Sequence, residues 1–232
     1  MQFVTGHLYH IYNQGNNRQK IFHNRDNYLF FLRKIHKHVL PFADILAWCL
    51  MPNHFHLMVH VNHVEIELTP GATQSCARSS SESQTRSEME VIPTPTQSRA
   101  RNNQRDDETM SFNKSIGIML ASYTRAINKQ QNWSGSLFRS ETKAACLTDI
   151  NEISPNWITK MGITEFIIDN HDIEYPNVCF NYILSNPVKA RLVKRAEDWE
   201  FSSCSDFIGI RMGRLINRRR IQEFGLNITG SN

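Results

Sequence analysis

The stretch MPNHFHLMVH, residues 51–60, decides how the first half of the chain folds. Pro52 and Asn53 are typical of a turn, and the residues after them are those of a strand. Side chains two positions apart on a strand share a face, so His54 and His56 lie side by side. The apolar residues that alternate with them face the other way. The stretch therefore predicts a strand with a core-facing apolar side and a histidine pair on the opposite side.

The segments on either side of this strand predict an order of β-α-β-β-α-β-α. Helical spacing of apolar residues marks the expected helices, and short apolar runs between turn signals mark the strands. The expected elements are strand 7–14, helix 25–39, strands 42–50 and 54–61, helix 111–129, strand 137–147 and helix 175–185. Pro187 is expected just past the last helix. This order favours an α+β fold, a ferredoxin-like sandwich with a mostly antiparallel sheet and helices on one face.

Composition divides the chain into four parts. Residues 1–64 and 110–203 are the two halves of one domain. Ser, Thr, Gln, Arg and Glu dominate residues 65–109, which predicts a low-complexity insertion with too few apolar residues to form a core. A second insertion is expected near 148–172, and 204–232 reads as a basic C-terminal tail. The first insertion is a tolerated surface segment or a functional one. The second is a lid, a dimer element or a sign of decay.

The overall composition excludes several classes of protein. The 232 residues carry a net charge of +4, which alone does not establish nucleic-acid binding. The five cysteines are odd in number and include no C-x-x-C pair, which argues against a disulfide framework or zinc knuckle and favours a reducing compartment. No apolar run approaches the ~20 residues of a membrane span, and no secretory signal is apparent. We expect a cytoplasmic protein without a membrane partner.

The histidine pair suits a metal ion. His54 and His56 are ~6.6 Å apart along the strand at ~3.3 Å per residue, close enough to converge on one ion with bonds of ~2.1 Å. His60 shares their face but lies ~13 Å beyond His56 by the same rise. The alternative is a pair of hydrogen-bonded structural histidines. Metal binding needs a third ligand from elsewhere in the chain.

A later stretch, FNYILSNPVKARLV at residues 180–193, predicts a helix with a tyrosine and an amide on one edge. Tyr182 and Asn186 are four residues apart, and side chains at that spacing are neighbours on a helix. Either the two project together into a site, or Tyr182 packs with its hydroxyl at the surface. Tyr123, the rival nucleophile, belongs to the apolar stripe of helix 111–129, which indicates a role in the core.

Three stretches together resemble one family. MPNHFHLMVH, SYTRAINKQQNWSGSLFRSETKA (122–144) and NYILSNPVKARLV (181–193), followed by Trp199 and Phe201, resemble the single-tyrosine HUH transposases. These are the insertion-sequence-200-like proteins, and in particular the REP-associated tyrosine transposases. The resemblance implies a ferredoxin-like fold, His54 and His56 as the HUH metal ligands, Tyr182 as the nucleophile and Asn186 as an amide ligand.

The resemblance also implies an activity. It is metal-dependent nicking and joining of single-stranded DNA through a 5′-phosphotyrosyl intermediate, as in DNA transposition. A free tyrosine hydroxyl has a pKa near ~10 and is a poor nucleophile without help. The implied cofactor is Mg²⁺ or Mn²⁺, with no nucleotide cofactor, and the implied partner is single-stranded or hairpin DNA. The protein is expected as a monomer or homodimer. The alternative is a catalytically inactive, transposase-derived protein that binds DNA hairpins.

Basic residues provide candidates for phosphate contacts. Lys189, Arg191 and Lys194 follow the expected helix, and Arg218, Arg219 and Arg220 lie in the expected tail. Each either holds a backbone phosphate or is solvated surface charge. Trp133 and Phe138 are candidates for stacking on unpaired bases.

Overall fold

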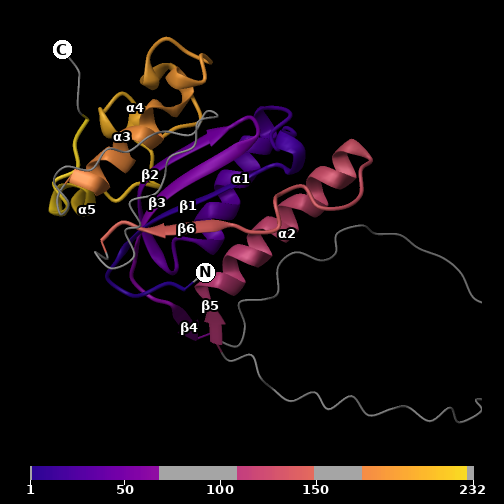
Figure 1. Cartoon of the computed structure of the whole chain (residues 1–232), viewed down its shortest axis with the longest axis horizontal. Coiled ribbons are helices and arrows are strands. Elements are labelled where there is room, and N and C mark those ends of the chain that lie inside the picture. Colours follow the sequence, from indigo (N-terminus) through magenta and orange to yellow (C-terminus); the bar gives the residue numbers. More distant parts are fainter. Residues whose placement is uncertain (1, 68–108, 149–173, 229–232) are drawn as a thin grey trace, which may run out of the picture. The chain divides into compact units, whose positions relative to one another are not determined.

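The computed structural model describes residues 2–67, 109–148 and 174–228 (Figure 1). Two compact units are distinguished: residues 1–66 with 111–232, and residues 67–110. The fold that positions the candidate site belongs to the first unit. The expected insertion at 65–109 falls largely outside the described residues. So does the second expected insertion, apart from Thr148.

A four-stranded antiparallel sheet forms the centre of the first unit. Its strands are β1 (Leu8–Gln14), β2 (Ala43–Met51), β3 (His54–Val61) and β6 (Lys143–Cys146), in the spatial order β2-β3-β1-β6. Every neighbouring pair is antiparallel. With α1 between β1 and β2 and α2 between β3 and β6, this is the ferredoxin-like arrangement that the sequence predicts. Two short strands, β4 (Glu65–Glu67) and β5 (Thr109–Ser111), form a separate two-stranded sheet.

Helices α1 (Arg25–His38) and α2 (Phe112–Gln131) cover the apolar face of the sheet. Asparagine and serine N-caps begin them: the side chains of Asn24 and Ser111 each accept a bond from a backbone N–H in the first turn. Phe31 of α1 and Tyr123 of α2 meet 4.8 Å apart, and Phe31 lies 5.1 Å from Phe55 of β3, as measured between ring centroids. These contacts explain why every second residue of β3 is apolar.

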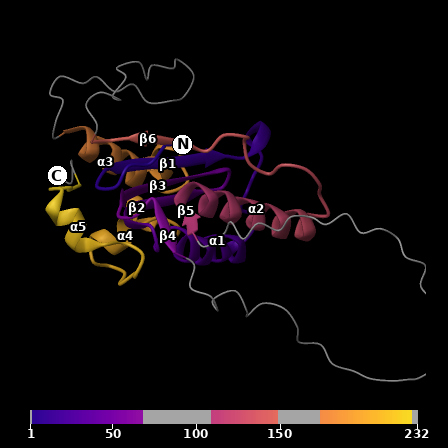
Figure 2. The ribbon, with the colours of Figure 1, turned by 90° about the horizontal axis from the view of Figure 1, so that it is seen from below.

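The remaining helices pack on the opposite face, which corrects the expectation of helices on one face only. Two short 3₁₀ turns, η1 (Asn16–Arg18) and η2 (Ala196–Asp198), follow β1 and α3. The helices of the opposite face are α3 (Glu174–Lys189), α4 (Cys204–Phe207) and α5 (Arg218–Glu223). In Figures 1 and 2 these orange and yellow helices lie apart from α1 and α2. The histidine face is covered as a result: His56 is 5% exposed, and His60 packs 5.5 Å from the ring of Phe224.

Two element boundaries differ from expectation. Pro187 lies inside the last turn of α3 rather than past its end. Proline there forfeits one backbone hydrogen bond near the helix terminus, and the Pro187 carbonyl still accepts from the N–H of Leu192. The expected strand 137–147 is reduced to β6, although Leu137 and Phe138 are buried and Phe138 forms an isolated antiparallel bridge with Gly15. Among the described residues, no helix combines the length and apolar character needed to cross a membrane.

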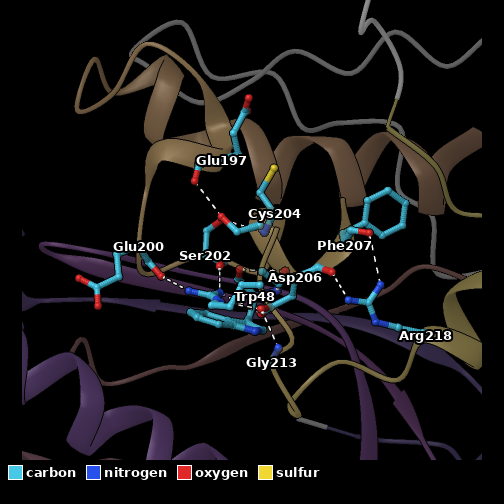
Figure 3. Close-up of polar contacts among 12 residues, drawn as sticks. Trp48, Glu197, Glu200, Ser202, Cys204, Asp206, Phe207, Gly213 and Arg218 are labelled. Atoms are coloured by element: carbon cyan, nitrogen blue, oxygen red, sulfur yellow. Dashed lines mark hydrogen bonds and ion pairs between the residues drawn. The ribbon is translucent and has the colours of Figure 1, made fainter. Parts of the chain in front are cut away.

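The expected tail from residue 204 is folded instead. Asp206 of α4 is 1% exposed, and Arg211 donates to both of its carboxylate oxygens, at 2.9 Å from Nη2. Gly213 N donates to the same carboxylate at 3.1 Å (Figure 3). The Arg211 guanidinium also lies 5.5 Å from the ring centroid of Trp48 in β2. The buried Asp206 carboxylate thus attaches the loop to α4, and the Arg211 guanidinium packs that loop against the sheet.

Candidate active site

Strand β3 presents His54 and His56 on the face that α3 covers. Their ring centroids are 5.0 Å apart and their planes are nearly perpendicular. In the register with β1, Tyr12 lies opposite His56. The alternation predicted from the sequence therefore places both imidazoles on one face, and the sheet holds them there through its central strand.

Asn186 of α3 bridges the two histidines. Its Nδ2 lies 3.3 Å from His56 Nε2, and its Oδ1 lies 3.3 Å from His54 Nε2. The side chain is only 7% exposed, so the contact is made away from solvent. Asn186 follows His54 by 132 positions and His56 by 130 positions in the chain, and the fold brings these three side chains together.

Tyr182 lies one helical turn before Asn186. Its ring meets His56 edge-on, with centroids 5.4 Å apart and planes at 79°. Lys189 Nζ lies 5.0 Å from the centroid of the Tyr182 ring. The i, i+4 and i, i+7 spacings on α3 thus place a phenol, an amide and an ammonium group along one side of the helix.

Hydrogen bonds define which imidazole nitrogens carry protons. Asn53 Nδ2 donates to the Arg18 carbonyl at 3.3 Å, which orients Asn53 Oδ1 as the acceptor for His54 Nδ1–H at 2.6 Å. His54 Nε2 therefore carries a lone pair. Asn186 Nδ2 donates to His56 Nε2, which makes that nitrogen an acceptor too. Both histidines direct an Nε2 lone pair toward Asn186.

Burial keeps these imidazoles neutral. It lowers the pKa of His54 and takes the pKa of His56 well below 6.5, where nearby His10 and His54 act in the same direction. Burial also lowers the pKa of His10 to about 3. A metal ion binds the neutral form of histidine, so the site is in its ligating form at neutral pH without having to lose protons.

The donor set fits a divalent cation. His54 Nε2 lies 3.3 Å from Asn186 Oδ1; with the His54 proton on Nδ1, both atoms present lone pairs that a divalent cation would satisfy. Two imidazoles and an amide oxygen would be the protein ligands; imidazole suits ions such as Zn²⁺ and Ni²⁺, and a carbonyl oxygen suits Mg²⁺ and Mn²⁺. Within the described residues, no group of three or more His, Cys, Asp or Glu side chains offers another metal site.

His60 stays out of the cluster, as its distance predicts. Its Nδ1 lies 3.0 Å from Asn62 Oδ1. Tyr123 is likewise a core residue: its hydroxyl donates to the Ile21 carbonyl at 2.7 Å, and its side chain is fully buried. Tyr182 is therefore the better placed of these two tyrosines for chemistry at the histidine pair.

Two residues of β1 complete the site and were not predicted. His10 Nε2 lies 2.9 Å from His56 Nδ1, and the Tyr12 ring stacks on His10 at 4.8 Å. Burial raises the pKa of Tyr12, and nearby Tyr182 and Cys179 add to the effect. The alternation of positions 8, 10 and 12 shows that His10 and Tyr12 share a face. The pairing of β1 with β3 is what brings that face to the histidines.

The basic candidates fall into two groups. Lys189 contacts Tyr182, while Arg191 and Lys194 are exposed just beyond α3. None of these three forms an ion pair with another described residue. This group lies at the C-terminal end of the helix that carries Tyr182.

The arginines of α5 are engaged within the protein. Arg218 donates to the carbonyls of Asp206 and Phe207, Arg219 pairs with Glu223, and Arg220 pairs with Asp44 and Glu223. Their assignment to DNA binding stays a prediction, and these internal partners would compete with phosphates. Phe138 is 4% exposed in the aromatic core, so it is not available for stacking on bases, whereas Trp133 is 45% exposed.

Comparison with known proteins supports the fold. The chain is similar to a REP-associated tyrosine transposase solved in complex with a REP hairpin, with a TM-score of 0.50 and 14% sequence identity. The alignment covers 90% of this chain and 83% of that one. No protein-family model matches the sequence, and no curated protein matches it significantly. At this identity the likeness establishes the shared fold alone.

Proposed function

We propose that this protein nicks and rejoins single-stranded DNA with Tyr182 as the nucleophile, in the manner of a transposase. The observation that carries the proposal is the convergence of Tyr182 and Asn186 with both β3 histidines. The Tyr182 ring lies 5.4 Å from that of His56, and the Asn186 amide lies 3.3 Å from both Nε2 atoms. The fold shared with a tyrosine transposase adds support.

His54, His56 and Asn186 would hold the divalent ion, Mg²⁺ or Mn²⁺, which when bound polarises a phosphate and offsets charge as it builds. In the cleavage step the Tyr182 oxygen attacks the scissile phosphorus, and the bond from phosphorus to the 3′ oxygen breaks. The phenolic proton passes to solvent, and the departing oxygen takes a proton to become a free 3′-OH. Lys189, whose Nζ lies 5.0 Å from the centroid of the Tyr182 ring, would pair with the phosphate.

The product of that step explains strand joining without ATP. The 5′ phosphate stays linked to Tyr182 through a phosphodiester, so the energy of the broken bond is retained. Attack by another 3′-OH on that phosphorus reverses the step and releases Tyr182. Single-stranded or hairpin DNA is the proposed substrate, because a tyrosine transposase of similar fold was solved bound to a REP hairpin. An unpaired strand can also reach a phenol on a helix.

Covalent capture tests the proposal. The protein is incubated with single-stranded hairpin DNA and Mn²⁺, and the protein–DNA adduct is read on a denaturing gel. Wild type is expected to form the adduct, and Tyr182→Phe to lose it, because the substitution removes the attacking oxygen and keeps the ring against His56. Tyr12→Phe serves as the test of the nearest other phenol. An adduct lost in Tyr12→Phe but kept in Tyr182→Phe would transfer the role to Tyr12.

A second candidate is a non-catalytic protein that binds DNA hairpins. It is favoured by the enclosure of the site: Asn186 is 7% exposed and its amide already contacts both histidines. This function predicts hairpin binding that survives Tyr182→Phe and EDTA, with no adduct from any variant. Binding without adduct in the wild type would therefore favour this candidate over the nuclease.

A further inference from the structure

His10 contacts His56, one of the two histidines of the candidate metal site. It lies on β1 and its Nε2 is 2.9 Å from Nδ1 of His56, on the side of that ring away from Asn186. Its ring lies 5.0 Å from that of His56, stacks on Tyr12 at 4.8 Å and meets Tyr182 edge-on at 6.2 Å. His10 thus contacts one candidate ligand and packs against the candidate nucleophile.

The proton on His56 is assigned by its two neighbours together. Asn186 Nδ2 donates to His56 Nε2, so the single proton of the neutral ring is on Nδ1. Nδ1–H then donates to His10 Nε2. His54 has the same tautomer, but a different acceptor, Asn53 Oδ1, fixes it.

We propose that His10 is a positioning residue for the metal site, because it accepts the His56 Nδ1 proton and so directs the His56 Nε2 lone pair toward Asn186. The inference rests on the proposed function, since it concerns the same metal site. Partners of this kind fix both the tautomer and the ring orientation of a ligating histidine, and their loss commonly weakens metal affinity about 10- to 100-fold. Asn53 performs the equivalent task for His54.

Two substitutions separate this role from simple packing. His10→Phe keeps a flat ring to stack on Tyr12 but offers no acceptor. His10→Gln replaces the ring with an amide whose oxygen can reach about the position of Nε2 and accept the same proton. If His10 only fills space, His10→Phe should preserve Mn²⁺ affinity better than His10→Gln. If His10 accepts the proton, His10→Gln should preserve it better. His60→Phe is the matched control, because His60 is a buried histidine on the same face of β3 whose own partner is Asn62.

The experiment measures Mn²⁺ affinity by titration calorimetry on the full chain. The ¹⁵N shifts of the His56 imidazole are recorded in the metal-free protein. We expect His10→Phe to bind Mn²⁺ about 10- to 100-fold more weakly than wild type. His10→Gln should regain most of the affinity, and His60→Phe should bind as wild type does. The ¹⁵N shifts should show His56 protonated on Nδ1 in wild type and in His10→Gln. In His10→Phe, where Nδ1–H has no acceptor, the Asn186 amide should turn over so that its Oδ1 accepts from Nε2–H, and the proton should be mainly on Nε2.

The outcomes that contradict the metal site differ from those that contradict the role of His10. Absence of Mn²⁺ binding by wild type would overturn the metal site itself. Wild-type binding with unchanged affinity in His10→Phe, or with His10→Gln no better than His10→Phe, would overturn only the role of His10. If His10→Phe does not fold, the wild-type spectrum decides alone, because His56 protonated on Nε2 there contradicts the proposed hydrogen bond.

Discussion

The candidate site depends on three histidines that are held neutral by burial. His10, His54 and His56 lie between the sheet and α3, and desolvation lowers the pKa of each. A group whose folded-state pKa lies below its unfolded value of about 6.5 binds a proton more readily in the unfolded chain. The three histidines therefore contribute stability that is complete above pH 6.5 and is lost as the pH falls.

We predict that the free energy of unfolding of the metal-free protein decreases from about pH 6.5 to pH 5. Each histidine contributes a slope of up to about 1.4 kcal/mol per pH unit. Urea unfolding at half-unit pH steps in EDTA measures it, within a window above the range where carboxylates titrate. His10→Gln should make the pH slope of the free energy of unfolding shallower, because one of the three titrating imidazoles is removed. A stability that is flat across this window would mean that the histidines are already protonated or solvated in the folded protein.

At this scale the sequence predicts the residues that depend on local spacing. His54 with His56, and Tyr182 with Asn186, follow from periods of two and four residues within one element. His10 could not be predicted in the same way. Its contact with His56 depends on the register in which Tyr12 lies opposite His56, and register is a property of two strands 40 residues apart.

At the scale of elements, the loop after α4 depends on a glycine beside a buried carboxylate. A Cβ at Gly213 would lie 2.5 Å from Oδ1 and 2.6 Å from Cγ of Asp206. Asp206 cannot easily withdraw, because it is 1% exposed and Arg211 holds both of its oxygens. The backbone must approach this closely for Gly213 N to donate to the carboxylate.

We predict that Gly213→Ala lowers the free energy of unfolding by about 1–3 kcal/mol, the usual effect of overpacking a filled site. Gly117→Ala is the matched control. Gly117 is an exposed residue inside α2 whose added Cβ meets nothing within 4 Å, so alanine there should stabilise by about 0.5–1 kcal/mol. Chemical denaturation compares the two. Equal effects from the same substitution at both positions would show that the approach of Gly213 to Asp206 is not what constrains the loop.

Elements were predicted well where amphipathicity defined them and less well elsewhere. Helices α1 and α2 match the expected stripes because they cover the face made by Phe55 and its alternate neighbours. The position of α3 on the opposite face was missed, since a strand that carries histidines looks half-exposed in sequence. The tail was missed for a similar reason. Arginines such as Arg211 read as solvated charge until their buried partner, Asp206, is known.

At the scale of the whole molecule, the two faces of the sheet have different tasks. The side covered by α1 and α2 is an aromatic core around Phe31 and Tyr123. The side covered by α3 holds the polar residues of the candidate site. A net charge of only +4 cannot by itself attract DNA strongly, so any DNA binding must depend on where unpaired cations lie. Lys189, Arg191 and Lys194 form no ion pair with another described residue, whereas in α5 Arg219 and Arg220 are ion-paired and Arg218 donates to backbone carbonyls.

Arg191 permits a test in which stability and DNA binding change in opposite directions. It is an exposed residue with a φ of 57°, a left-handed conformation that costs a residue with a Cβ about 1–2 kcal/mol. We predict that Arg191→Gly raises the free energy of unfolding by about 0.5–1 kcal/mol. Glycine avoids the cost of the left-handed conformation, but it loses more conformational entropy on folding, which offsets part of the gain. The same variant should bind a single-stranded hairpin more weakly. Loss of one phosphate contact should lower the slope of log affinity against log salt by about 0.7.

Two control variants distinguish three possible causes of a lower salt slope. These are the loss of charge at the end of α3, the loss of one unit of total charge, and the relief of a left-handed backbone conformation. Asn132→Gly relieves another left-handed residue, φ 54°, without changing charge, so its salt slope should equal that of wild type. Arg219→Gln removes the same unit of charge from α5, where Arg219 already pairs with Glu223 at 2.8 Å. Fluorescence anisotropy over a salt series measures all three. If Arg219→Gln lowers the slope as much as Arg191→Gly, the DNA responds to total charge, and the end of α3 is not its binding surface.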